Sequence, residues 1–171
     1  GTNRRQRQMC IRDSFYTKRK PIASPSDLKG LKIRVMESVT AMKMVESMGG
    51  SPTPISWGEL YTSLQQEVVD GAENNPPSFY LSKQFEVCKH YTLDEHTTLP
   101  DVLVSGSYFW DGLNENQKEW LNEAVEISVI YQRQLWAESE AYSLRELKKA
   151  GVEIVYPVSY THLTLPTIRT V

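Results

Sequence analysis

Cysteine is scarce in this chain: among its 171 residues only Cys10 and Cys88 are present. Cys10 lies in an N-terminal stretch with no usable periodicity, so neither a disulfide framework nor a cysteine-based metal site can be built from the one cysteine that remains. The run from Glu86 to Lys89 is typical of helix, where Cys88 serves as a small apolar residue. A catalytic thiol at Cys88 is the alternative.

Long apolar runs are missing as well. No stretch approaches the roughly 18 to 20 apolar residues that cross a bilayer, which argues against direct membrane insertion. Three early arginines (Arg4, Arg5 and Arg7) are not followed by the apolar segment that a signal peptide requires. The composition, 40% hydrophobic and 23% charged, is ordinary for a globular protein, and the length is enough for one domain with its own core.

The two ends of the chain differ from its middle. Residues 1–14 have no usable period, and residues 159–171 are unrelated to what precedes them. Both resemble translated sequencing-adapter sequence, so we predict a non-native leader at 1–14, a non-native tail at 159–171 and a folded part at 15–158. The ends hold five basic residues and one acidic residue, which leaves 14 basic and 20 acidic residues in the middle and a formal net charge there of −6. Such an acidic body argues against nucleic acid or an anionic membrane as a partner.

Hydrophobic periodicity predicts alternating strands and helices in the first half. Strands are expected at 32–36 and 53–56, and helices at 39–48 and 58–69. This order predicts a largely parallel sheet with helices packed on it.

The second half of the chain predicts longer helices and strands. Pro76 and Pro77 predict an extended turn, because proline fixes its own φ and biases its predecessor away from helix, and this places Asn74 and Asn75 in a loop. The elements expected after them are a helix at 79–90, an extended segment at 97–108, a helix at 114–150 with an asparagine N-cap, and a strand at 152–155. The long helix would measure roughly 55 Å, which is more than one small domain needs.

Three side chains suit the binding of a small carboxylate. Arg34 ends the first strand, Trp57 starts the second helix and Asn74 follows that helix. An arginine fork pairs with two carboxylate oxygens, an amide can donate to the same anion, and an indole face can cover the apolar side of a ligand. From pattern alone a solvated or salt-bridged arginine, a core tryptophan and a turn asparagine stay open as alternatives.

The same region carries a set of phrases that together resemble a known family. They are Asp27-Leu28-Lys29-Gly30-Leu31-Lys32-Ile33-Arg34-Val35, Gly50-Ser51-Pro52-Thr53-Pro54, Glu59-Leu60-Tyr61, Leu64-Gln65 and Val69-Asp70-Gly71-Ala72-Glu73-Asn74, followed by a long terminal helix. With this order and spacing, the run from about Ser24 to Val158 resembles the solute-binding subunit of tripartite ATP-independent periplasmic (TRAP) transporters, the DctP-type family, and matches most of that family's second lobe.

The resemblance implies an α/β fold of the periplasmic-binding-protein type (type II-like), with a mostly parallel sheet, flanking helices, a hinge and one long spine helix. A first lobe and an export signal are expected upstream. The implied function is capture of a small organic acid in the periplasm, closure about the hinge and delivery to the TRAP membrane permease subunits. Neither catalysis nor a cofactor nor a metal is expected.

The resemblance also assigns roles to individual residues. Arg34 matches the arginine that clamps the ligand carboxylate, Asn74 matches the amide-bearing contact, and Trp57 matches an aromatic residue that packs on the ligand.

Glu73, Asn75 and Glu95 complete the predicted site. Asn75 and Glu95 fit as hydrogen-bond partners for ligand hydroxyls, since a polyol acid needs several donors and acceptors. The phrase Glu73-Asn74-Asn75-Pro76-Pro77 looks closer to binders of sugar acids, such as uronates or aldonates, than to binders of sialic acid.

Other interpretations stay open. Asp94-Glu95-His96, joined by Glu73, could perform acid/base or metal chemistry, although neighbours on an extended strand point to opposite faces and no paired-histidine spacing accompanies them. A ligand-sensing module of a signalling protein could share the fold. The ligand could also be a C4-dicarboxylate or a 2-oxo acid.

Overall fold

The computed structural model describes residues 5–157, with side chains described from residue 11 onward. Its strands are β1 (Arg5–Thr17), β2 (Lys32–Val35), β3 (Ser51–Pro54), β4 (Gly71–Asn74), β5 (His90–Thr92), β6 (Thr97–Val104) and β7 (Glu153–Val155). Its α-helices are α1 (Val39–Ser47), α2 (Leu60–Gln65), α3 (Pro76–Leu81), α4 (Ser107–Asp111) and α5 (Glu115–Lys149). Short 3-10 helices are η1 (Pro25–Leu28), η2 (Trp57–Glu59) and η3 (Gln84–Glu86).

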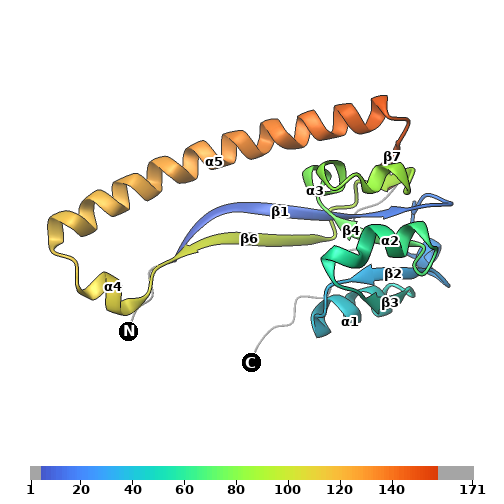
Figure 1. Ribbon diagram of the computed structural model, residues 1–171, viewed down its shortest axis with the longest axis horizontal. Helices are drawn as coiled ribbons and strands as arrows, with labels where there is room; N and C mark the ends of the chain where they lie inside the picture. Colours follow the sequence, from blue (N-terminus) through green and yellow to red (C-terminus); the bar gives the residue numbers. More distant parts are fainter. Residues whose placement is uncertain (1–4, 158–171) are drawn as a thin grey trace.

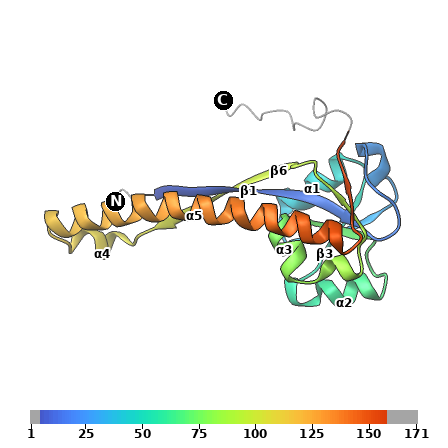
Figure 2. The same ribbon diagram turned by 90° about the horizontal axis from the view of Figure 1, so that it is seen from above.

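One mixed sheet organises the molecule, with the strand order β3-β2-β4-β1-β5-β7 and with β6 paired to β1 outside this row. β2 is parallel to β3 and β4, and β5 is parallel to β7. The predicted α/β lobe is therefore confirmed, but the sheet is mixed and not mostly parallel as expected, because β1 makes antiparallel pairs with β4, β5 and β6 that the sequence did not predict. In Figure 1 a lobe of short strands and helices lies at one end, and β1, β6 and α5 extend from it as an arm. Figure 2 shows α5 lying along the ribbon of β1 and β6.

Strand β1 includes most of the stretch that we expected to lie outside the fold. Residues 5–13 pair with β6, and residues 14–17 pair with β4. The predicted boundary at residue 15 is thus corrected, because residues 5–14 belong to the sheet. Ladder hydrogen bonds are made by the backbone, so this pairing does not depend on particular side chains. The adapter origin of residues 1–14 stays a prediction, and the predicted tail at 159–171 lies outside the described residues.

Two apolar cores cover the two faces of the sheet, and neighbouring residues of β1 serve one core each. Tyr16 packs with residues of α2, α3, β5 and the C-terminal part of α5, namely Leu60, Leu64, Phe79, Tyr91 and Leu147. Phe15 packs on the opposite face with residues of η1, β2 and α1, namely Leu28, Ile33, Val35, Met44 and Val45. The alternation of side chains along a strand explains this division, and through it β1 contributes side chains to both cores.

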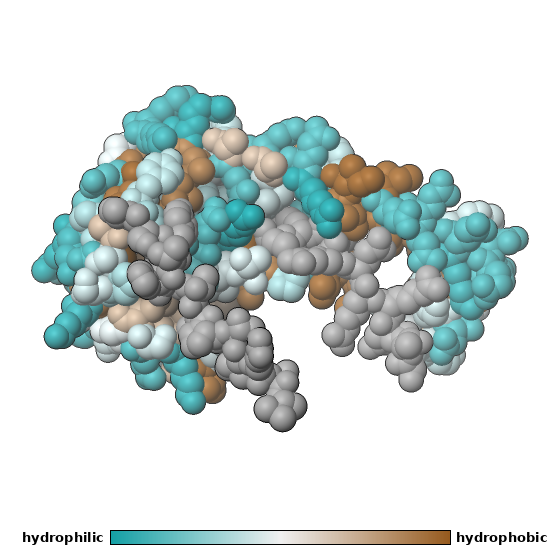
Figure 3. Space-filling model, turned by 180° about the vertical axis from the view of Figure 1, so that it is seen from behind, coloured by the Kyte–Doolittle hydropathy of each residue, from teal (hydrophilic) through white to brown (hydrophobic). Residues whose placement is uncertain are grey.

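The arm exposes more apolar surface than the lobe. Helix α5 begins with the reciprocal capping box of Asn114 and Gln117, as predicted, and runs unbroken for 35 residues. Exposed apolar side chains along the arm are Leu99, Val102, Leu103 and Val104 on β6 and Trp120, Ile127, Ile130 and Tyr131 on α5. Figure 3 shows apolar patches within a mainly hydrophilic surface. Among residues 5–157, no helix combines the length and the apolar composition that a bilayer crossing requires.

The start of α3 differs from the prediction. Pro76 and Pro77 occupy the first turn of the helix rather than an extended turn, and Asn75 is its N-cap. Proline is tolerated there because the first helical N–H groups have no partner within the helix. Asn74 is accordingly the last residue of β4 and not a loop residue.

Two predicted helices are shorter than expected. The helix predicted at 58–69 ends at Gln65, and Glu67 beyond it has a φ of 62°. The helix predicted at 79–90 ends at Leu81, because Lys83 adopts a left-handed conformation with a φ of 57°. Apolar residues continue at helical spacing beyond both helix ends, so periodicity alone predicted helices that are too long.

Gly71 allows β4 to approach β1, so we expect Gly71→Ala to destabilise the protein. A Cβ there would lie 2.2 Å from the backbone oxygen of Tyr16 and 2.9 Å from Cγ2 of Thr17, and neither strand can move without disturbing a core. We expect a loss of about 3 kcal/mol in the free energy of unfolding, measured by urea denaturation. Gly58→Ala is the matched control, because no heavy atom lies within 4 Å of its added Cβ. Equal midpoints for the two variants would contradict the close approach.

Candidate functional site

The carboxyl ends of three parallel strands meet at one edge of the lobe. β2, β3 and β4 end at Val35, Pro54 and Asn74, and Arg34 lies in register with residues of both neighbouring strands. Ligands of open α/β sheets typically bind outside this edge. The structure therefore brings Arg34, at the end of β2, to the same edge as Trp57, just after β3, and Asn74.

Arg34 is fixed in position and almost fully buried. Only 3% of its surface is exposed, whereas Trp57 is 47% exposed. Nε of Arg34 donates to the backbone oxygen of Ile55 at 2.8 Å, and Cζ lies 5.8 Å from the centre of the Trp57 ring, a cation–π contact. Because Nε is engaged, the two terminal nitrogens are the groups that can pair with an anion. Among the side chains that the structure describes, no carboxylate lies within ion-pair distance of Arg34.

Asn74 and Asn75 are joined to each other and to the start of α3. Oδ1 of Asn74 accepts from both the backbone nitrogen and Nδ2 of Asn75, each at 2.9 Å. Oδ1 of Asn75 accepts from the backbone nitrogen of Ser78 at 3.0 Å, and its Nδ2 also lies 3.4 Å from Oδ1 of Asp13. The side chain of Asn75 is thus engaged within the protein, and it is only 5% exposed.

Glu73 lies on the face of β4 opposite to Asn74, within a buried polar cluster. In the pairing of β4 with β1, Glu73 lies beside Phe15. Burial, and secondarily the nearby Asp13 carboxylate, raise the pKa of Glu73 to about 7, while His96 and Arg34 act in the opposite direction. Burial likewise raises the pKa of Asp13. The cluster therefore holds carboxyl groups that resist ionisation.

Asp94 and His96 join Glu73 in this cluster, as the alternative acid/base interpretation of the sequence required, although neither was among the predicted ligand-binding residues. Nδ1 of His96 lies 2.8 Å from Oδ2 of Asp94, and the His96 ring stacks on Phe15 with 4.0 Å between centroids. The backbone nitrogen of Phe15 donates to Oδ1 of Asp94 at 3.1 Å. The sequence carried no reliable signal for this pairing, because Glu95 between them has a φ of 46° and the segment is therefore not an extended strand in which residues i and i+2 share a face.

Glu95 is separated from this cluster. It has a φ of 46°, and its carboxylate forms an exposed ion pair of 2.7 Å with Arg12. Its backbone nitrogen donates to Oγ of Ser14 at 3.1 Å. The structure therefore turns Glu95 away from Asp94 and His96, and it does not join Glu95 to Arg34.

Two kinds of reactive group, metal ligands and the Cys88 thiol, bear on what chemistry the lobe can perform. Among the described residues, no group of three or more His, Cys, Asp or Glu side chains is arranged to hold a metal ion. Burial raises the pKa of Cys88 to about 12, so its thiol stays protonated and is a poor nucleophile. What the edge offers is a set of fixed hydrogen-bond donors, a positive charge and an aromatic face.

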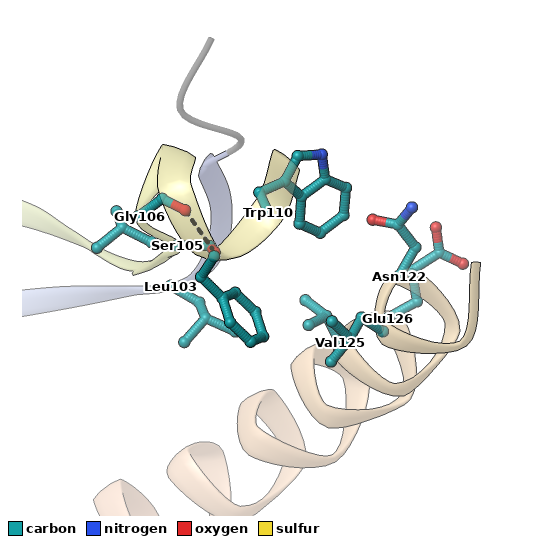
Figure 4. Close-up of a pocket in the computed structure, with 10 residues that line it drawn as sticks. Leu103, Ser105, Gly106, Trp110, Asn122, Val125 and Glu126 are labelled. Carbon is teal, nitrogen blue, oxygen red and sulfur yellow. Dashed lines mark hydrogen bonds between the residues drawn. The ribbon is translucent and has the colours of Figure 1, made fainter. Parts of the chain in front are cut away.

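A cavity of about 710 Å³ lies away from this edge, at the far end of the arm (Figure 4). Its lining comes from β6, α4 and α5: Leu103, Val104, Ser105, Gly106, Phe109, Trp110, Leu121, Asn122, Val125 and Glu126. None of the six predicted site residues lines it. Its charged residue, Glu126, would repel an anion, so the cavity is a poor site for a carboxylate.

Comparison with protein families gives one match that covers most of the chain. The profile of the bacterial extracellular solute-binding proteins, family 7 (DctP), matches residues 12–163. A solute-binding protein of Chromohalobacter salexigens is 40% identical over 82% of this chain and 42% of its own length. The C4-dicarboxylate-binding periplasmic protein of Rhodobacter capsulatus is 33% identical over 77% of this chain and 39% of its own length.

Solved structures of TRAP periplasmic solute-binding proteins share the fold. One from a Sulfitobacter species with bound β-D-galacturonate has a TM-score of 0.83 and 38% identity, covering 93% of this chain and 54% of that chain. One from Chromohalobacter salexigens with bound D-glucuronate has a TM-score of 0.85 and 35% identity, with the same coverage. The chain thus spans about half the length of the relatives that it matches.

The raised pKa of Glu73 predicts a pH-dependent stability. A glutamate in the unfolded chain titrates near 4.5, so between about pH 4.5 and 7 the folded protein binds more protons than the unfolded chain. Stability should therefore fall as the pH rises through this window, by up to about 1.4 kcal/mol per pH unit for this group. Urea denaturation at pH 5, 6 and 7 measures the slope, which Glu73→Gln should reduce. Glu46→Gln, at an exposed position, is the control. An unchanged slope in Glu73→Gln would show that Glu73 does not cause the pH dependence.

Proposed function

Because the chain belongs to the bacterial extracellular solute-binding proteins of family 7, we propose that it forms the ligand-binding lobe of a receptor that captures a small carboxylate. The favoured ligand is a sugar acid such as a uronate or an aldonate. Arg34 carries the proposal: its guanidinium is 3% exposed, has no carboxylate within ion-pair distance among the described side chains, and lies at the carboxyl edge of the sheet. A buried charge is costly until it is paired, and a ligand carboxylate would supply the partner.

Each group at the edge has a distinct role in this proposal. The two terminal nitrogens of Arg34 pair with the two carboxylate oxygens, since Nε is already bonded to Ile55. Nδ2 of Asn74 donates to the same carboxylate. The exposed face of Trp57 covers the apolar face of a sugar ring, which supports a sugar acid over a short dicarboxylate.

Capture involves the remainder of the longer protein, as in relatives of about twice this length. The exposed apolar side chains of α5 and β6 would pack on that remainder, since a face of this kind is rarely left open to water. The ligand would be enclosed by closure about the β1 and β6 ribbon, without any chemical step. We infer delivery to TRAP permease subunits in the periplasm, consistent with relatives that are named periplasmic.

A C4-dicarboxylate is the second candidate ligand, favoured by the Rhodobacter relative. Both candidates present a carboxylate to Arg34, and they differ in what lies over Trp57. Calorimetric titration of D-glucuronate, D-galacturonate and succinate against the protein expressed from its whole reading frame separates them. Tighter binding of succinate than of either uronate would overturn the sugar-acid assignment.

Arg34→Lys should weaken uronate binding by about 2 kcal/mol or more, roughly a 30-fold rise in Kd, because an ammonium group cannot reproduce the two-point fork. Calorimetry decides this. Arg19→Lys is the matched control, since Arg19 is exposed and paired with Glu67 away from the edge. Equal affinities for the Arg34 variant and the unmodified protein would remove Arg34 from the site.

Trp57→Ala should raise the Kd for a uronate about tenfold while shifting the Tm of the unliganded protein by little, because nearly half of the Trp57 surface is already exposed. Thermal unfolding and calorimetry of the same preparation measure both quantities. A sharp drop in Tm with affinity retained would instead assign Trp57 to the core.

A further inference from the structure

The Asn74 amide is held in one orientation by Asn75. Its Oδ1 lies 2.9 Å from the backbone nitrogen of Asn75. Because a backbone N–H can only donate, the atom that it meets must be the amide oxygen. Nδ2 of Asn74 therefore faces the other way, as a donor.

Asn75 is oriented in turn by the two prolines that follow it. As the N-cap of α3, it can accept only from the early N–H groups of the helix, and Pro76 and Pro77 have none. The N–H of Ser78 is the first one available, and it donates to Oδ1 of Asn75 at 3.0 Å. This bond fixes Nδ2 of Asn75 on the opposite side, where it lies 2.9 Å from Oδ1 of Asn74.

We propose that Asn75 is a positioning residue and not a ligand contact: it locks Asn74 so that Nδ2, and never Oδ1, faces the carboxylate bound by Arg34. This inference rests on the proposed function, because it assumes that Asn74 meets the ligand. It revises the role that the sequence suggested for Asn75, whose side-chain oxygen and nitrogen are both engaged within the protein. A rotated Asn74 would present its oxygen to the anion, so the lock also favours anions over neutral ligands.

The test is a double-mutant cycle on the protein from the whole reading frame, with D-glucuronate as the probe in calorimetry. Asn75→Ser keeps an oxygen that can cap the Ser78 N–H, so α3 is retained. It removes the Nδ2 donor and leaves Oδ1 of Asn74 with only the backbone N–H of residue 75 to hold it. We expect a Kd about five to ten times higher, with the Tm nearly unchanged. In an Asn74→Ala background, Asn75→Ser should have no further effect on Kd, because its target is gone. Ser78→Ala is the matched control, since it leaves the backbone donor of α3 in place.

The outcomes separate this inference from the proposed function. If Asn74→Ala alone leaves Kd unchanged, the proposed role of Asn74 fails and the positioning role fails with it. If Asn74→Ala weakens binding while Asn75→Ser does not, only the positioning role is overturned. Equal losses from Asn75→Ser in both backgrounds would make Asn75 a direct ligand contact, again overturning the positioning role alone.

Discussion

The backbone pairing of β1 holds the other parts of this structure together. On one side β1 joins the parallel group of β2, β3 and β4, and on the other it joins β5 and β7, while its first half forms the ribbon with β6. Its adjacent residues Phe15 and Tyr16 enter the two cores on opposite faces of the sheet. Without β1 the two parallel groups would share no strand, and α5 would have no ribbon to lie against.

The electrostatics of the lobe also depend on this strand. β1 brings Asp13 next to β4, and the Phe15 backbone fixes Asp94 and so places His96 near Glu73. Several acids are therefore buried on one face of the sheet, while Arg34 lies towards the other face at the carboxyl edge. This separation leaves the guanidinium without an internal carboxylate partner among the described side chains, although the body of the protein is rich in acids.

Local signals predicted much of this architecture. The reciprocal cap of Asn114 and Gln117 and the alternation around Arg34 are readable because each depends on neighbours a few residues apart. β1 could not be predicted from the sequence, because its partner β6 lies far along the chain and the hydrogen bonds between the two strands are made by the backbone. The burial of Glu73 beside Asp13 and His96 joins residues more than 20 positions apart, and no local pattern encodes it.

The start of α3 was predicted wrongly for a different reason. A pair of prolines suits both an extended turn and the first turn of a helix, and only the Asn75 cap decides between them.

The edge residues are fixed before any ligand is present, which bears on how an acidic protein can bind an anion. A net charge of −6 in the middle of the chain repels an anion at long range, so affinity in the proposed function must come from short contacts in a region of low dielectric. Arg34 is immobilised through Ile55, and Asn74 is immobilised through Asn75. Ordering a flexible side chain on binding costs about 0.5–1.5 kcal/mol, and here that cost is met during folding. The prolines after Asn75 therefore affect more than the helix that they start. Because Pro76 and Pro77 have no N–H, Asn75 accepts from Ser78, and this sets the direction of the neighbouring Asn74 amide at the carboxyl edge. At that edge Arg34 has no carboxylate partner among the described side chains.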